Sequence, residues 1–566
     1  MQGQGRERLG VRFLRGTVLW IVLAALLSVA GVSGCADPTV QYHRQFDYLR
    51  RVGGEALSDE RYGDARKHLM KGAKLAQIAA ASDLEVIDAL TQLTRACREL
   101  GLLEEALGHA NLASQILARH RLGHGGTSSG VYRVGAAYLL ERGRLEVARG
   151  DFTAAELALA DFIRVRGEDG GDPRESTEAQ LLLGELRLAL GLESEARALF
   201  RSSLEQARSF SQPDAVVLGL ALFRVADSKL DKANAESAAA LAREARPEGV
   251  AELELRPGLL LLHGSIDAVE GKRERAGVRL EEAFAFLERD DPAMLRDIAA
   301  PAHAVALAGR VFDLAEQREA LVESVMRALE TAEAGSPLRR MQAGRQAVAV
   351  GRRLYDAGGW GPGLKLMAAG RHLIDAAVAS RPHDALVAAH FEIVTALEAR
   401  GRAAAAARRC DWLVASSGDL SPRARALHPA RLLLCGRAAM DAGEPKRAKP
   451  AFGRALMIAE KDEAVPLRRV ELLLRLSALA HSQARDAEED KLFERLLPFV
   501  LPGVYEDLER LIVDAYAPYG RYQPSSAAAR LGHAAARNHA YAVEAPQLQG
   551  LAEKLGGEPS PASASH

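Results

Sequence analysis

The sequence predicts an all-α solenoid built from antiparallel helix pairs, and two observations lead to this prediction. First, small residues recur at fixed offsets. A glycine is followed by a second glycine seven residues later, by an alanine after five more residues, and by a large apolar residue after four more. Second, this register returns about every 42 residues through most of the 566-residue chain. Self-similarity at such a period is the sequence signature of a repeat architecture.

The N-terminal segment has the features of a secretory signal. Four arginines precede an uncharged apolar run over residues 17–32, which is the order of a signal peptide. The arginines are Arg6, Arg8, Arg12 and Arg15. The run ends in Val32-Ser33-Gly34-Cys35, which resembles the lipobox of bacterial lipoproteins, although that family prefers leucine where Val32 stands.

The lipobox resemblance implies a lipid anchor at Cys35. In that family the cysteine thiol is alkylated with diacylglycerol, the chain is cut before the cysteine, and the new amine is acylated. More than one acyl chain holds a protein stably on a bilayer. We therefore expect a signal peptide at 1–34 and an acylated cysteine with a tether at 35–47. Ala36 directly after Cys35, with Asp37 one residue later, predicts the outer membrane facing the periplasm by the enterobacterial rule, with the inner membrane as the alternative.

The repeat pattern has a steric explanation. Small residues let two helices approach closely, and the second glycine ends the first helix of each pair because glycine tolerates a left-handed cap. The large residue four positions after the alanine lies on the same helical face. The clearest copies contain Gly143, Gly150 and Ala155; Gly184, Gly191, Ala196 and Phe200; Gly264, Gly271 and Ala276; and Gly436, Gly443, Ala448 and Phe452. A weaker copy is read at Ala308, Ala315, Ala320 and Ser324, and degenerate ones near Asp231 and Ala484.

This pattern resembles the tetratricopeptide repeat, although that family has a period of ~34 residues. The resemblance implies a right-handed solenoid, with ten or eleven helix pairs in a repeat domain over residues 48–500. It also implies that the first helix of each pair lines a concave groove that binds a protein partner. Projecting the register outward selects Arg95, Arg98, Arg144, Glu185, Arg352, Tyr355, Phe391, Arg437 and Met440 as groove residues. Each of them also has the simpler interpretation of a solvated helix residue.

The register fades after Leu501. We expect C-terminal capping helices within 501–556, at about 503–516 and 525–541, and a disordered tail at 557–566. Tyr516, Tyr519 and Tyr522 flank a turn, and we expect them to cap the end of the solenoid, which otherwise exposes an apolar face.

The remaining chemistry predicts no catalytic site, no metal site and no cofactor. The sequence has none of the short nucleotide-binding, hydrolase or metalloprotease motifs, and its 15 histidines show no metal-ligand spacing. Cys97 is expected to be a buried small apolar residue. Cys410 and Cys435 fall on core-facing positions of adjacent repeats; two buried thiols are the favoured interpretation and a disulfide is the alternative.

These features favour a membrane-anchored scaffold or assembly factor of the bacterial cell envelope, which binds envelope proteins in the groove and catalyses nothing. The formal charge of −1 argues against a nucleic-acid partner, and no small-molecule substrate is evident. Two alternatives remain. One is a cytoplasmic scaffold or regulator on an uncleaved signal anchor, and the other is an envelope hydrolase whose catalytic residues are too dispersed to recognise.

Overall fold

The computed structural model describes residues 38–556 with short gaps. The residues outside the description are 1–37, 77, 80, 125–128, 170–171, 211–214, 229, 246–249, 289–298, 379–382, 417–419, 462–465, 501–504, 518–522, 539 and 557–566. The signal segment with Cys35, the C-terminal tail, and both Tyr519 and Tyr522 therefore lie outside the described residues. Among the helices that are described, none combines the length and the apolar character needed to cross a membrane.

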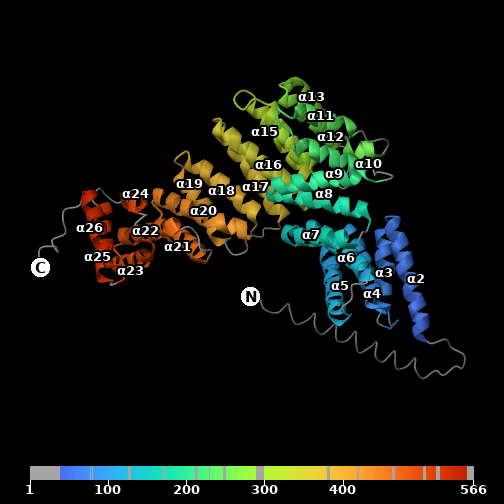
Figure 1. The fold of residues 1–566 in the computed structure, drawn as a ribbon. Coiled ribbons are helices and arrows are strands. Elements are labelled where there is room, and N and C mark those ends of the chain that lie inside the picture. The colour runs from blue at the N-terminus through green and yellow to red at the C-terminus, as the bar shows by residue number, and fades with distance from the viewer. Residues whose placement is uncertain are drawn as a thin grey trace, which may run out of the picture. The chain divides into compact units, whose positions relative to one another are not determined.

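The described chain folds into helices joined by turns, which confirms the predicted all-α solenoid (Figure 1). Two compact units are distinguished, at residues 1–145 and 146–566, and the boundary falls within α6. The first unit contains α2 (Pro38–Ser58), α3 (Tyr62–Leu75), α4 (Asp83–Glu99), α5 (Leu103–His124) and most of α6 (Ser129–Arg149).

The second unit continues the alternation of first and second helices. It begins with α7 (Phe152–Asp169), α8 (Pro173–Leu190), α9 (Glu193–Arg208), α10 (Ala215–Ser228), α11 (Ala235–Glu244), α12 (Val250–Val269), α13 (Arg273–Leu287), α14 (Ala300–Val311) and α15 (Arg318–Glu333). It continues with α16 (Pro337–Asp356), α17 (Trp360–Ala377), α18 (Asp384–Glu398), α19 (Ala403–Ala415), α20 (Pro422–Asp441), α21 (Pro445–Lys461), α22 (Pro466–Ser482) and α23 (Asp486–Leu496). A 3₁₀ turn at Leu497–Phe499, α24 (Tyr505–Tyr516), α25 (Gln523–Arg537) and α26 (Ala545–Lys554) complete it. In chain order α2 to α23 make eleven pairs.

The turn inside each pair has a constant geometry. Seven of these turns carry a glycine in the left-handed region, with φ between 65° and 90°. In each of them the second helix begins two residues after this glycine, which we call the turn residue. The seven are Gly101, Gly150, Gly191, Gly271, Gly358, Gly401 and Gly443. Two further pairs place a side chain in the same conformation, Glu60 with φ 58° and Ala484 with φ 52°.

The turn between α14 and α15 departs from the predicted register. Asp313 Oδ1 accepts hydrogen bonds from the backbone N–H groups of Ala315 and Glu316, at 2.7 and 3.2 Å, so an aspartate-stabilised turn replaces the glycine cap. This turn shifts α15 by one residue. Its fully buried positions are Leu321, Val325 and Ala328, whereas the predicted Ala320 is half-buried and the predicted Ser324 is 7% exposed.

The small residues of the pattern mark close contacts between helices. A Cβ atom added to Gly184 would lie 2.4 Å from the ring of Phe200, and one added to Gly436 would lie 2.1 Å from the ring of Phe452. Gly264 instead faces Leu307 of the following pair, at 2.7 Å. Gly143, Ala155, Ala196, Ala276 and Ala448 are all buried. The register therefore places its smallest residues where two backbones or an aromatic ring leave no room.

The N-terminal boundary of the repeat domain and the helices of the capping segment differ from the predicted ones. Helix α2 begins at Pro38, so residues 38–47 are helical and not a tether. The reason is that Phe46, fully buried, already belongs to the core that α2 forms with α3 and α4. At the other end α25 stops at Arg537, short of the expected residue 541, and α26 adds a helix that was not predicted.

Candidate functional site

The predicted groove residues differ in their exposure and contacts. Arg95 on α4 and Arg437 on α20 are exposed, as a groove residue must be. Arg98 is instead committed to its neighbours, because its Nε donates to Glu141 at 2.6 Å and its Nη2 lies 2.9 Å from Glu99. These contacts join α4 to α6 and leave Arg98 half-buried.

Two of the groove predictions are wrong. Tyr355 is 2% exposed because it turns into the core beside Gly363, whose added Cβ would meet the Tyr355 backbone at 2.7 Å. Glu185 is buried in contacts with another first helix, as described below. The prediction failed at these positions because it assumed that each first helix has one side facing solvent, whereas the corresponding sides here face the core or another first helix.

The other predicted groove residues are half-buried and already in contact with neighbouring side chains or backbone. Arg352 donates through Nη1 to Glu392 at 3.2 Å and to Thr395 at 2.8 Å, which joins α16 to α18. The guanidinium of Arg431 lies 5.6 Å from the ring centroid of Phe391, which joins α18 to α20. Arg144 and Met440 are likewise half-buried and interact with neighbours.

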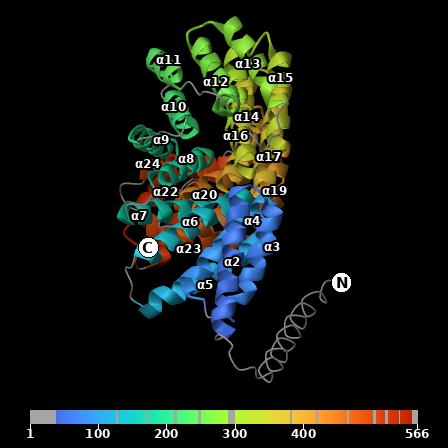
Figure 2. The same cartoon turned by 90° about the vertical axis from the view of Figure 1, so that its right-hand side faces the viewer.

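Five first helices of the second unit close on themselves. Each of α8, α10, α12, α14 and α16 contacts the next, and α16 contacts α8; we call this arrangement the first-helix ring (Figures 1 and 2). Gln342 on α16 donates through Nε2 to the backbone oxygen of Glu185 at 3.0 Å and to its carboxylate at 2.8 Å. Arg345 donates to the backbone oxygen of Leu188 at 2.9 Å and to that of Ala189.

Charged side chains fill the contacts of this ring. Arg224 on α10 is 3% exposed, and it forms an ion pair with Glu185 and lies 3.4 Å from the ring nitrogens of His303 on α14. The imidazole of His303 in turn lies 3.3 Å from Asp227. Burial opposes ionisation of Asp227, but His303 and Arg224 outweigh it and lower the pKa of Asp227 to about 2. These contacts bury Glu185 and Arg224 among α8, α10 and α16, so Glu185 does not face an open groove, although Gln342 Oε1 is buried without a hydrogen-bond partner.

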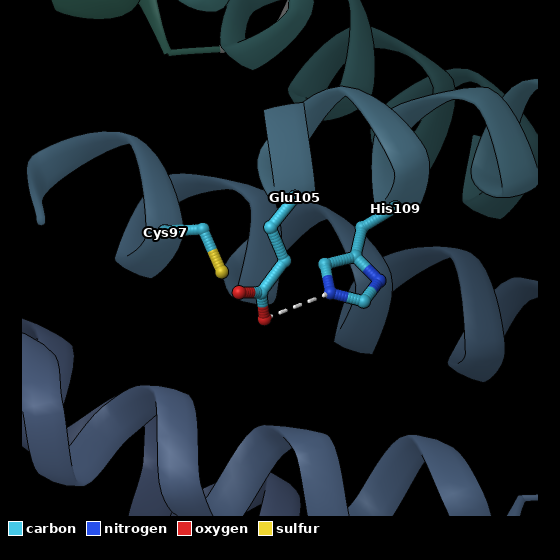
Figure 3. Close-up of side chains that lie close together, drawn as sticks. All are labelled: Cys97, Glu105 and His109. Carbon is cyan, nitrogen blue, oxygen red and sulfur yellow. Dashed lines mark ion pairs between the residues drawn. The ribbon is translucent and has the colours of Figure 1, made fainter. Parts of the chain in front are cut away.

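A cluster of possible metal ligands lies in the first unit. Cys97 on α4 and Glu105 and His109 on α5 point toward one another, and His109 Nε2 lies 3.6 Å from Glu105 Oε1 (Figure 3). Cysteine, histidine and carboxylate are ligands of zinc. Sequence analysis missed this cluster, although Glu105 and His109 have the spacing that places two side chains on one helical face.

An arginine already neutralises this cluster. Arg66 on α3 binds both oxygens of Glu105, through Nε at 3.0 Å and Nη2 at 2.9 Å. Burial, together with Glu105, raises the pKa of Cys97 to about 11, so the thiol is protonated. A metal ion would have to displace the guanidinium and ionise the thiol. The arrangement therefore fits an ion pair between second helices better than a metal centre.

Two further groups of this kind in the described chain are also neutralised by arginine. In the group of His43, Asp47 and Glu85, Arg50 lies 3.6 Å from Asp47. In the group of His481, Asp486 and Glu489, Arg530 lies 2.5 Å from the fully buried carboxylate of Glu489. The expectation of no metal site therefore stays a prediction, and these clusters have a structural role that explains them.

Cys410 on α19 and Cys435 on α20 form a disulfide, with Cα atoms 5.4 Å apart. The favoured sequence interpretation of two buried thiols is thus wrong. The two core-facing positions belong to adjacent repeats, and their distance across the helix packing is a geometric quantity that spacing does not contain. Cys97 is buried and is not in a disulfide.

Comparisons with known proteins give little beyond this geometry. No family model and no curated protein matches the chain. Among solved structures, a tetratricopeptide repeat protein from Parabacteroides merdae is 17% identical over 51% of this chain and 93% of its own, with a TM-score of 0.33. The apo form of RapI is 10% identical over 74% of this chain and 99% of its own, with a TM-score of 0.36. Both likenesses are weak, so the fold assignment is drawn from the helix pairs themselves.

Proposed function

We propose that the chain is a lipid-anchored scaffold or assembly factor of the bacterial cell envelope that binds a protein partner and catalyses nothing. The observation that carries the proposal is that the described chain consists of helix pairs and end helices throughout. The three clusters of possible metal ligands within it are each paired with an arginine of the same chain. Arrays of this kind present surfaces to partners rather than reacting groups to substrates. The lipobox at Val32 to Cys35 supplies the anchor, and Ala36 favours the outer membrane facing the periplasm.

The disulfide supports export over the cytoplasmic alternative. Disulfides persist in oxidising compartments and are rare in the cytosol. The bond between Cys410 and Cys435 therefore fits a protein that has crossed the inner membrane. A scaffold on an uncleaved anchor with its repeats in the cytosol would keep both thiols reduced.

Counting reactive thiols separates these two functions. The chain has four cysteines. Protein taken from cells, denatured without reduction and treated with a maleimide is expected to react at Cys97 alone, and at three thiols after reduction, because Cys35 is acylated. Cys97→Ser is the matched control and should leave no reactive thiol before reduction. Four reactive thiols before reduction would contradict the proposal and favour the cytoplasmic scaffold.

The anchor itself is tested by metabolic labelling with an alkynyl fatty acid. The wild-type chain should carry the label and Cys35→Ser should lose it; equal labelling of both would refute the lipoprotein assignment. Sucrose-gradient fractionation then decides the leaflet, and sedimentation with inner-membrane markers would overturn the outer-membrane placement.

We propose that the partner binds first helices of the second unit beyond the first-helix ring, where Arg437 remains exposed. Arg437→Glu reverses a charge on the first-helix face of α20, whereas Arg408→Glu makes the same change at an exposed arginine of the second helix α19. Crosslinking in intact cells followed by mass spectrometry identifies the envelope proteins that the wild-type chain contacts. These proteins should be absent from the crosslinks of Arg437→Glu and present in those of Arg408→Glu. Loss with both variants, or with neither, would contradict a partner site on this face.

A further inference from the structure

One side of α2 is uncovered along its length. Val40, Arg44, Tyr48, Arg51 and Glu55 recur at intervals of three or four residues, so they form a single line on the helix, which we call the end stripe. All five are exposed, including Val40 at 43% and Tyr48 at 54%. The opposite side of α2 carries Phe46 and Leu49 and faces the core.

The repeat register explains why this side is bare. Glu60 is the turn residue of the first pair, because it has the left-handed conformation that glycine has in other pairs. Tyr48 stands twelve residues before it. The same position in α4 is Ala89, which is 1% exposed and packs against Phe46 and Ala76 of the preceding pair. In α6 it is Tyr138, which is 7% exposed within the core of the first unit. Both later first helices of the first unit therefore bury this position, whereas Gln346 holds it in α16 of the second unit and is exposed; no pair of the described residues precedes α2.

The end stripe borders a shallow hollow of about 600 Å³ between α2 and α4. Arg44, Tyr48, Arg50 and Arg51 line it from α2, and Asp88 and Gln92 line it from α4. Arg50 is held by Asp88 at 3.0 Å and by Asp47 at 3.6 Å. The guanidinium of Arg51 lies 6.0 Å from the ring centroid of Tyr48 and reaches Glu55 only at 4.0 Å, and the Arg44 side chain is exposed. The stripe thus presents two solvent-facing guanidinium groups on either side of an exposed aromatic ring.

We propose that the end stripe rests on an anionic lipid surface, the same membrane to which Cys35 is attached. This inference rests on the proposed lipid anchor. Two residues, Ala36 and Asp37, lie between Cys35 and Pro38, and three residue steps can span at most about 10 Å, so the stripe begins close to the proposed acyl chains. From Val40 to Arg51 it runs about 17 Å along the helix.

The composition of the stripe suits a membrane interface. Tyrosine places an apolar ring and a polar tip at the headgroup level, and arginine keeps its charge among phosphates while its stem lies on apolar surface. Guanidinium groups also bind phosphate oxygens in a bidentate manner. Contact along α2 would fix the orientation of the anchored array, which a flexible lipid anchor by itself leaves undetermined.

The test uses the mature chain, which begins at acylated Cys35, on vesicles of phosphatidylcholine with and without phosphatidylglycerol. An environment-sensitive fluorophore is attached under native conditions through Tyr48→Cys, and the matched control carries it through Lys67→Cys, an exposed position on α3 opposite its buried side. The wild-type chain treated in the same way gives the background from Cys97, which is buried. We expect the emission at position 48 to shift to shorter wavelength on phosphatidylglycerol vesicles, to lose that shift with Arg44→Glu and Arg51→Glu, and to stay unchanged at position 67.

Several results would overturn the inference. One is an emission at position 48 as water-like as that at position 67 on both kinds of vesicle. Another is a shift in detergent that the uncleaved Cys35→Ser chain shows and the mature chain lacks, since residues 1–34 would then be the occupant of the stripe. A shift that grows with protein concentration without vesicles would indicate a second copy, and one that needs an added envelope protein would indicate a protein partner.

Flotation with the vesicles separates this inference from the proposed function. A chain that floats through acylated Cys35 but shows no shift at position 48 refutes the end-stripe contact and leaves the lipid anchor standing. A chain that does not float, and whose Cys35 is unmodified by mass spectrometry, refutes the anchor and with it the inference.

Discussion

At the C-terminal end of the repeats Tyr516 is fully buried, whereas at the N-terminal end Tyr48 is 54% exposed. The Tyr516 hydroxyl donates to Glu489 at 2.9 Å, and Arg530 donates to the other oxygen of the same carboxylate at 2.5 Å. Helices α24 and α25 thereby cover the last repeat pair with a network that we call the C-terminal lock. No described element does the same for α2. The comparison teaches that, within the described residues, further helices cover the C-terminal end of the array and none covers the N-terminal end.

The C-terminal lock depends on an exception to the repeat register. Glu489 stands five residues after the turn residue Ala484, where other second helices have a buried alanine such as Ala196 or Ala448. A carboxylate at a closely packed position needs partners, because an unpaired buried charge is costly. Tyr516, Arg530 and His481 supply them, the last at 3.2 Å. The two ends therefore differ in chemistry: a buried carboxylate with three partners lies at the C-terminal end, and an uncovered helix face lies at the N-terminal end.

The largest expected effect comes from truncating the same register position in two first helices. Tyr138→Ala should lower the free energy of unfolding by about 3–5 kcal/mol, because it opens a cavity under a covering pair. Tyr48→Ala should change it by no more than ~0.5 kcal/mol, as exposed substitutions do. Urea unfolding of both variants beside the wild type measures the difference. Equal losses would mean that Tyr48 is covered and that the N-terminal end is closed.

The next largest effect on the free energy of unfolding is expected from removing the Glu489 carboxylate at the C-terminal end. Glu489→Ala should cost about 3 kcal/mol, because Arg530, Tyr516 and His481 lose their common partner. The neighbouring Glu488→Ala removes a half-exposed ion pair with Lys449, 2.7 Å away, and should cost less than ~1 kcal/mol. Hydrogen exchange should show the Glu489→Ala loss in α22 to α25. A neutral Glu489→Ala would show that the lock does not stabilise this end.

A smaller effect on the free energy of unfolding is expected from lowering the pH, through a histidine in a helix pair that lies between the two ends. His428 on α20 is fully buried, and burial together with Arg431 lowers its pKa to about 4. Between pH 6.5 and 4 the unfolded chain binds a proton at this histidine and the folded chain does not, so stability falls as pH falls. The loss should reach about 2 kcal/mol at pH 5. The difference between the urea midpoints at pH 7 and pH 5 should become smaller in His428→Leu, while His390, whose pKa burial lowers to about 3, still contributes; an unchanged pH dependence would contradict this assignment.

The smallest effect concerns the two turns that lack glycine, one near each end. Glu60 and Ala484 adopt a left-handed conformation that costs an L-residue roughly 1–2 kcal/mol. Glu60→Gly and Ala484→Gly should therefore each raise the free energy of unfolding by up to about 1 kcal/mol, offset in part by the flexibility of glycine when unfolded. Urea unfolding measures both. If either variant is less stable than the wild type, the strain assigned to that turn is absent.

The parts of this fold that the sequence predicts are those with local steric causes. Gly191 is required by a positive φ and Gly436 by the ring of Phe452, and both causes lie within one repeat. The closure of α16 on α8 joins Gln342 to Glu185 across 157 residues, and it depends on the winding of the whole stack, which no repeat contains. The candidate site was predicted least accurately, because projecting the register outward placed Glu185 in a groove, whereas the packing of the first-helix ring buries it.

The most direct test of the central claim is hydrogen exchange by mass spectrometry along the whole chain in detergent, without a membrane or partner. Stability in such arrays is nearly a sum of repeat and neighbour terms, so a bare end opens first. We predict that amides of α2 and α3 exchange faster than those of α22 to α25, which should be protected like the inner pairs. Faster exchange in α22 to α25 than in α2 and α3 would contradict the sealed and open ends on which this account depends.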